Sequence, residues 1–136
     1  AKAFDIPLVP GTEGAIDVVK EFDRLWVAKD YDGMRALMVD TATTYFSDGE
    51  VYRSADAAIR AIREDDMESN SDWTFDYAFS VDLDPPLGGE HVQAGFTVNT
   101  EKDGEEMKRR YHESYYVIEG KIVWYSSYAM KINEEI

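Results

Sequence analysis

At 136 residues, of which 44% are hydrophobic, the chain is long enough for one domain with a single sizeable core. The formal net charge is −14, a field that repels phosphate backbones and anionic lipid, so neither nucleic acid nor a membrane surface is expected as a partner. The absence of cysteine excludes disulfides, thiol nucleophiles and thiolate metal sites.

The first ten residues, 1–10, lack the charged-then-apolar pattern of a signal peptide and are expected to form an irregular leader. The alternative is a stub left after cleavage of an export signal, so cytoplasmic and exported locations both stay open. No later stretch contains the ~20 apolar residues of a membrane-spanning helix, and a soluble protein is expected. Residues 11–136 show no internal repeat or linker and should form one domain.

Three helices are predicted in the first half of the chain. Thr12 can cap the first, in which apolar residues recur at helical spacing as far as Trp26. Asp30 begins a second, shorter helix that is expected to include Met38. Ser54 caps the third, and its inward-facing residues are Ala55, Ala58, Ile59 and Ile62.

Strands are predicted on both sides of the third helix. Ala42–Phe46 favours a short strand, and Asp48-Gly49 after it is typical of a hairpin turn. Beyond residue 71 the hydrophobic period changes to two, which predicts four long strands joined by short turns and therefore antiparallel. In the first long strand one face is expected to carry Trp73, Phe75, Tyr77, Phe79, Val81 and Leu83. Separate helices and an antiparallel meander indicate an α+β fold.

The last two strands carry aromatic residues on both faces. Simple alternation puts Tyr111, Tyr115, Trp124 and Tyr128 on one face and Tyr116 and Tyr125 on the other. Because a sheet that is apolar on both faces needs cover on both, the helices are expected over one face and a second copy of the chain over the other. The sequence therefore predicts a homodimer.

This layout resembles the NTF2-like superfamily, which includes SnoaL-like polyketide cyclases, ketosteroid isomerases and scytalone dehydratases. The match covers about residues 13–131. Its residues are Asp30-Tyr31-Asp32-Gly33-Met34-Arg35-Ala36-Leu37-Met38, Asp40-Thr41-Ala42-Thr43, Ala57-Ala58-Ile59-Arg60 and the closing Gly120-Lys121-Ile122-Val123-Trp124-Tyr125-Ser126. The resemblance implies a cone-shaped barrel in which three N-terminal helices pack on a curved antiparallel sheet around a ligand pocket.

Ketosteroid isomerases use a carboxylate base and an oxyanion hole made by a Tyr and a protonated Asp. An ungapped match over residues 30–43 places Phe22 at the position of that Tyr and Phe46 at that of the base. The second carboxylic acid falls near His112 or Glu113, depending on a one-residue gap. Because a phenyl ring neither accepts nor donates a proton, the resemblance argues against isomerase activity.

Two titratable residues are candidates for catalysis. His112 lies where the resemblance to SnoaL-like proteins implies a cavity-facing side chain, and an imidazole there could transfer protons or bind a ligand. The alternative is a structural histidine bonded to a tyrosine or carboxylate. Asp48 is either a general base at the cavity mouth or the aspartate of a turn. His91 has no partner at metal-ligand spacing, so neither a metal nor another cofactor is expected.

Aromatic residues are the candidates for ligand binding. Trp26, Tyr125 and Tyr128 either line an apolar cavity or belong to the ordinary core. Only one of Tyr45 and Phe46 can face the pocket, since they alternate in one strand. The sequence therefore predicts a dimeric domain that binds a small apolar molecule. The alternative is a cofactor-free cyclase, isomerase, dehydratase or hydrolase in which His112 and Asp48 move protons.

Overall fold

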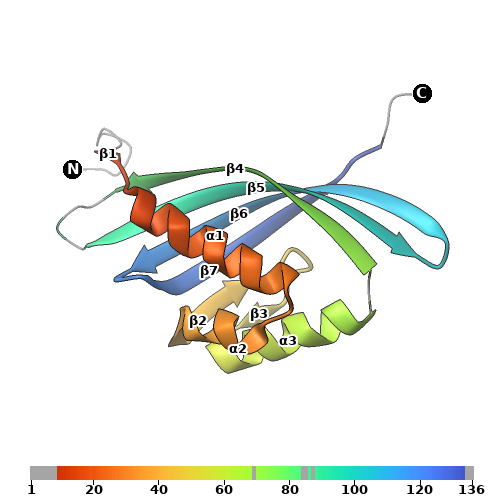
Figure 1. Cartoon of the computed structure of the whole chain (residues 1–136), viewed down its shortest axis with the longest axis horizontal. Coiled ribbons are helices and arrows are strands. Elements are labelled where there is room, and N and C mark those ends of the chain that lie inside the picture. The colour runs from red at the N-terminus through yellow and green to blue at the C-terminus, as the bar shows by residue number, and fades with distance from the viewer. Residues whose placement is uncertain (1–8, 69, 84–85, 87, 134–136) are drawn as a thin grey trace.

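The computed structural model describes residues 9–68, 70–83, 86 and 88–133, in which three helices lie on one side of a seven-stranded sheet (Figure 1). The helices are α1 (Glu13–Val27), α2 (Tyr31–Ala36) and α3 (Ala55–Glu68). The strands are β1 (Val9–Pro10), β2 (Met38–Tyr45), β3 (Val51–Tyr52), β4 (Asn70–Asp82), β5 (Gly89–Lys102), β6 (Glu105–Ile118) and β7 (Lys121–Lys131). Their order in the sheet is β1-β4-β5-β6-β7-β2-β3. The α+β class and the curved sheet over three helices are confirmed.

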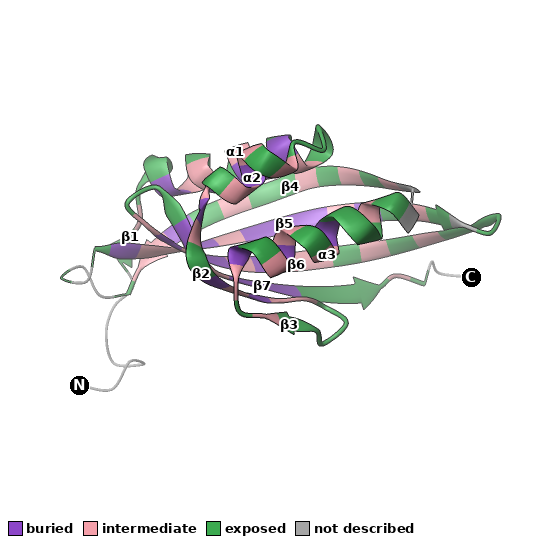
Figure 2. Cartoon of the chain, turned by 90° about the horizontal axis from the view of Figure 1, so that it is seen from below, coloured by how far each residue is buried: buried purple, intermediate pink, exposed green. Residues whose placement is uncertain are grey.

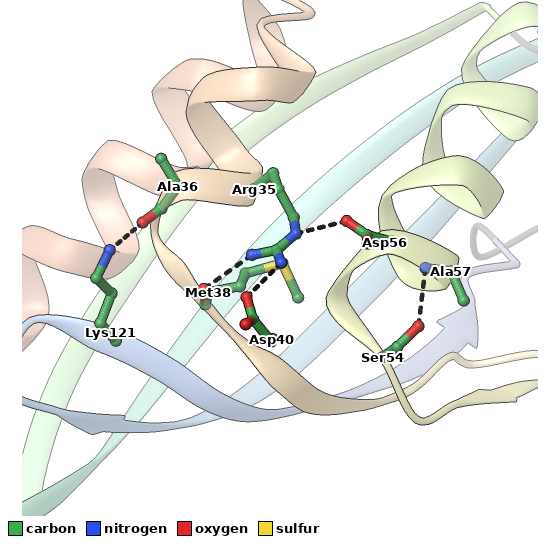
Figure 3. Close-up of polar contacts among 8 residues, drawn as sticks. All are labelled: Arg35, Ala36, Met38, Asp40, Ser54, Asp56, Ala57 and Lys121. Carbon is green, nitrogen blue, oxygen red and sulfur yellow. Dashed lines mark hydrogen bonds and ion pairs between the residues drawn. The ribbon is translucent and has the colours of Figure 1, made fainter.

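The three predicted helix starts are confirmed by their caps. The Thr12 hydroxyl accepts a hydrogen bond from the amide of Ala15, and the Asp30 carboxylate accepts one from the amide of Gly33. In α3 the Ser54 hydroxyl accepts one from the amide of Ala57 (Figure 3). Each side chain satisfies a backbone donor that has no partner inside its helix.

The second helix ends earlier than predicted. Met38 was expected to continue α2, but it begins β2 instead. The amide of Ile122 donates a 2.7 Å hydrogen bond to the carbonyl of Leu37. Pairing with β7 therefore replaces the helical hydrogen bonds from this point on. The β2–β7 pair is parallel, which the sequence did not predict, whereas the meander β4-β5-β6-β7 and the hairpin β2–β3 are antiparallel as predicted.

The expected uninterrupted alternation in β4 is wrong. The register of β4 against β5 shifts between Phe75 and Tyr77, the mark of a β-bulge. Phe75 packs against the core, whereas Tyr77 and Phe79 are 47% and 49% exposed. The single extra residue turns every later side chain to the opposite face, because the side-chain period of a strand is two.

The predicted grouping of aromatic residues on β6 and β7 is also wrong. Tyr115 of β6 lies opposite Tyr125 of β7, and both are buried. Tyr116 lies opposite Trp124, on the other face. The pairing register between strands, rather than the alternation within each strand, decides which residues share a face.

The hydrophobic core lies between the helices and the inner face of the sheet, the face toward the helices (Figure 2). Val19 and Phe22 of α1 and Met34 of α2 are buried there. One face of β5 contributes Val92, Ala94, Phe96 and Val98 to this core. The opposite face of the sheet is the outer face, and none of the three described helices covers it.

Polar contacts fix α2 and α3 to the sheet (Figure 3). The Arg35 guanidinium of α2 bonds the carboxylates of Asp40 on β2, at 2.6 Å, and Asp56 on α3, at 2.7 Å. It also donates to the carbonyl of Met38. Lys121 at the start of β7 donates to the carbonyl of Ala36. These contacts tie α2 to α3, to β2 and to the start of β7.

The expected leader lies mostly outside the described residues. Its last two residues, Val9 and Pro10, form β1 and pair with Asp82 and Val81 of β4. Residues 84, 85 and 87 of the predicted turn before β5 also lie outside the description. None of the described helices combines the length and apolar character that a membrane span requires.

Candidate functional site

A buried carboxyl group lies on the inner face of the sheet. Glu113 is in the middle of β6, and its side chain is only 2% exposed. Oε1 accepts a 2.8 Å hydrogen bond from the hydroxyl of Tyr115, and Oε2 accepts a 2.5 Å hydrogen bond from that of Tyr125. The Ser127 hydroxyl donates to Oε2 at 3.4 Å. All three donors are neutral, and none of the described basic side chains forms an ion pair with Glu113.

Burial dominates the electrostatics of this carboxyl group. It raises the pKa of Glu113 from 4.5 to about 7, against the effect of the hydroxyl donors, which stabilise the carboxylate. The negative charge of Asp23 on α1 raises that pKa further, and burial raises the pKa of Asp23 itself. Burial also lifts the pKa of Tyr115 and Tyr125 well above 10, so both hydroxyls stay protonated as donors.

Glu113 borders a pocket of about 190 Å³. The pocket lies between the end of α1, the end of α3, the start of β4 and the middle of β6. Its lining consists of Asp23, Trp26, Val27, Lys29, Asp66, Ser71, Asp72, Trp73, Glu113 and Tyr115. This volume is smaller than that of typical drug-sized ligand sites, so the pocket suits a small molecule.

Two tryptophans line the pocket. Trp26 and Trp73 lie with their ring centroids 5.8 Å apart and their planes 36° apart. Asp66 at the end of α3 connects this wall to the helix layer, because its carboxylate accepts hydrogen bonds from the indole of Trp26 and the hydroxyl of Tyr31. The orientation of Trp26 therefore depends on α3 as well as on its own helix.

The structure places His112 on the outer face, away from this pocket. Its Nε2 lies 2.8 Å from Oε1 of Gln93, and its Nδ1 lies 3.2 Å from the hydroxyl of Tyr77. This matches the alternative of a histidine bonded to a tyrosine. Asp48 is exposed, and its carboxylate accepts a hydrogen bond from the amide of Glu50, as the aspartate of a turn does. The structure does not bring His112 and Asp48 to the pocket.

The candidate ligand-binding residues divide between the two faces. Trp26 lines the pocket, and Tyr125 bonds the carboxyl group of Glu113. Phe46 packs on Tyr125 from the inner side. Tyr45 contacts Trp124, and Tyr128 lies opposite His112 with 62% of its surface exposed, so both belong to the outer face.

Sequence reasoning reached Glu113 only as one of two positions for a second carboxylic acid. The sequence did not show which side chains of β6 point inward. In the structure Tyr115 and Val117 are buried and alternate with partly exposed neighbours, and Glu113 falls in the same alternation as these two. Asp23, Asp66, Asp72 and Trp73 were not identified as site residues at all. Within the described part of the chain, no group of three or more histidine or carboxylate side chains is arranged to hold a metal ion.

No protein-family model matches this sequence, and no curated protein matches it at a significant level. Solved structures do match. An LEH-like epoxide hydrolase from M. tuberculosis is 15% identical, with a TM-score of 0.71 over 88% of this chain and 84% of that one. An NTF2-like protein from Burkholderia xenovorans is 14% identical, with a TM-score of 0.65 over 88% and 92%.

A third structure is a hypothetical protein with a ketosteroid isomerase-like fold from Catenulispora acidiphila, in complex with trimethylamine. It is 13% identical, with a TM-score of 0.68 over 82% of this chain and 83% of that one. Identities this low establish architecture and leave activity open. The helices, the curved sheet and these three likenesses together show that the chain has the NTF2-like fold.

Proposed function

We propose that the protein binds a small, largely apolar molecule in the pocket beside Glu113. The observation that carries the proposal is a fully buried carboxyl group at the edge of a pocket with indole walls. Burying a carboxyl group is costly, and packing an aliphatic residue there would cost less. A buried carboxyl group at a pocket marks a candidate ligand site, and indole walls supply apolar contact area around a polar anchor.

A solved neighbour supports small-molecule binding by this fold. The Catenulispora acidiphila protein was solved with trimethylamine, a molecule of four non-hydrogen atoms. A pocket of about 190 Å³ in the present chain accommodates molecules of that order.

The proposal can be tested by screening fragments of up to about ten non-hydrogen atoms by NMR. Binding should shift the indole resonances of Trp26 and Trp73, and Trp73→Ala should weaken it at least 10-fold. Tyr128→Phe on the outer face is the matched control and should leave binding unchanged. Native mass spectrometry of the purified protein would reveal a molecule already held. A screen in which no fragment shifts the pocket resonances would contradict the proposal.

A second candidate function is acid/base catalysis without a cofactor. A pKa of about 7 puts Glu113 where it can both donate and accept a proton near neutral pH. Hydrolysis, isomerisation, cyclisation and dehydration all need such a group. If epoxide substrates such as styrene oxide are hydrolysed, Glu113→Gln should lower kcat at least ~100-fold. The catalytic roles of His112 and Asp48 stay predictions, and their alanine variants would test them in the same assay.

We also infer that a second copy of the chain covers the outer face. Tyr77, Phe79, Tyr128 and Met130 are each about half exposed or more on this side, which is unusual for side chains of their size on an isolated domain. A two-fold dimer would bury them against themselves. Sedimentation analysis should give twice the chain mass, and Phe79→Asp should reduce it to the monomer. A wild-type monomer at micromolar concentration would contradict the inference.

A further inference from the structure

The pocket combines aromatic walls with an excess of negative charge. Four of its lining residues are acidic, Asp23, Asp66, Asp72 and Glu113, and one, Lys29, is basic. These four residues come from four different elements, α1, α3, β4 and β6, so folding brings them to the edge of one pocket, and Asp72 among them is exposed. The surface excess of acid in this chain does not explain Glu113, which is almost completely buried.

The buried carboxyl group has no positive partner in the protein. Its hydrogen-bond donors are the hydroxyls of Tyr115, Tyr125 and Ser127, which are neutral. Lys29 is exposed at the end of α1 and forms no ion pair among the described residues. Asp23, the titratable residue of α1 that faces Glu113, is acidic. On β5, the residue paired with Glu113 is Ala94. A cationic guest would supply the positive charge that no described side chain pairs with Glu113.

The indole rings favour the same kind of guest. The face of an indole attracts a cation through its quadrupole, and the attraction strengthens where water is excluded. Trp26 and Trp73 pack against each other and both line the pocket that Glu113 borders. An aromatic wall beside a buried carboxylate is the arrangement that recognises an alkylated ammonium group, which is apolar at its surface and positive at its centre.

From this geometry we propose that the pocket selects a small organic cation, an amine or quaternary ammonium compound, whose charge lies between the two indole rings and the carboxylate of Glu113. This inference rests on the binding function proposed above and specifies the chemical class of the ligand. Asp23 contributes to the negative potential beside Glu113, and Asp66 holds Trp26 in place through its hydrogen bond.

Binding of a cation should be coupled to loss of a proton. In the empty pocket the pKa of Glu113 is about 7, so the group is partly protonated at neutral pH. A cation favours the carboxylate and lowers that pKa, and the proton leaves to solvent as the cation enters. Affinity for a cation should therefore rise with pH through this region, whereas affinity for a neutral guest should not. Burial also raises the pKa of Asp23, so deprotonation of this group contributes to the increase in cation affinity at the lower end of the pH range.

The test uses choline and its neutral carbon isostere, 3,3-dimethylbutan-1-ol. Isothermal titration calorimetry at pH 8 should show choline binding at least 10-fold more tightly than the alcohol, with NMR shifts at Trp26 and Trp73. The ratio should fall toward one at pH 5.5. Titrations in two buffers of different ionisation enthalpy should show proton release with choline only.

Variants separate the pocket from the general acidity of the chain. Glu113→Gln should weaken the binding of choline at least 10-fold while the affinity for the alcohol stays constant. Unchanged binding of the alcohol also shows that the variant folds. Asp17→Asn removes one carboxylate from the exposed side of α1 and should leave both affinities unchanged.

The outcomes distinguish this inference from the proposed function. Binding of the alcohol with equal or weaker binding of choline at pH 8 would overturn the cation inference and leave the pocket as a binding site. Choline binding that Glu113→Gln does not change would also overturn it. Absence of pocket shifts with both probes would count against the cation inference and the proposed function together.

Discussion

Glu113 and His112 are neighbours in the chain and lie on opposite faces of one strand. The carboxyl group of Glu113 is enclosed by hydroxyl donors and the helix layer, and burial raises its pKa to about 7. The imidazole of His112 lies on the uncovered face, bonded to Gln93 and the partly exposed Tyr77. Residue type alone favoured the histidine as the proton carrier. The comparison teaches that the environment of a strand face, more than the identity of the side chain, decides which group is chemically unusual.

The tyrosines of β7 repeat this contrast. Tyr125 is buried and donates to the Glu113 carboxylate, whereas Tyr128 is 62% exposed three residues later. Both are amphipathic rings of the same kind. Only the inner one has a buried acceptor that needs its hydroxyl.

The largest expected effect concerns the pH dependence of stability. Folding raises the pKa of Glu113 from 4.5 to about 7, so the folded state binds this proton more tightly than the unfolded state does. Stability should fall as pH rises from about 4.5 to about 7 and then level off, a loss of about 3 kcal/mol from this group. Urea unfolding at pH 5 and pH 8 measures the loss.

Glu113→Gln cannot ionise and mimics the protonated acid, so the loss should disappear in that variant. Ser114 follows Glu113 in the chain, lies on the outer face and carries no titratable group. Ser114→Ala should therefore keep the wild-type pH profile. Equal pH profiles for wild type and Glu113→Gln would show that folding does not raise the pKa of Glu113. The proposed difference between the inner and outer faces would then be wrong.

A smaller effect is expected from removing single hydroxyl groups. Tyr125→Phe deletes a donor to the buried carboxylate and should cost about 2 kcal/mol at pH 8, where the acceptor is charged. Tyr128→Phe should change stability by less than about 0.5 kcal/mol, since this residue is exposed. Differential urea unfolding of the two variants compares the faces directly. Similar losses in both would mean that the hydrogen bond to Glu113 contributes little.

The smallest effect concerns Gly95, which lies beneath Tyr77 on the outer face. A Cβ atom at Gly95 would lie 2.1 Å from a ring carbon of Tyr77, so Gly95→Ala must displace that ring from His112. Because the half-exposed ring can move, the cost should be only about 1 kcal/mol. In a Tyr77→Ala background the substitution should cost nothing. A cost that persists there would place the strain in the backbone of β5.

Local patterns accounted for much of this architecture. Capping residues and helical spacing identify α1 and α3, and alternation with glycine-containing turns identifies the meander. The predicted side-chain faces of β4 and the predicted end of the second helix were wrong. The bulge after Phe75 turned Tyr77 and Phe79 outward, and the parallel pairing with β7 began β2 at Met38. The bulge depends on pairing with the neighbouring strand β5, and the start of β2 depends on pairing with β7, which is distant in sequence. The alternation of residues within a single strand encodes neither.

By itself the sequence determined that this chain forms helices and then a twisted meander, because capping, periodicity and turn chemistry are properties of neighbouring residues. Only the tertiary structure decided which of Glu113 and His112 meets the pocket. That choice follows from the phase of β6 against β5 and β7 and from the helices above them. The pocket itself joins Asp23, Asp66, Asp72 and Glu113 from four elements, and their common surroundings exist only once the sheet has closed over the helices.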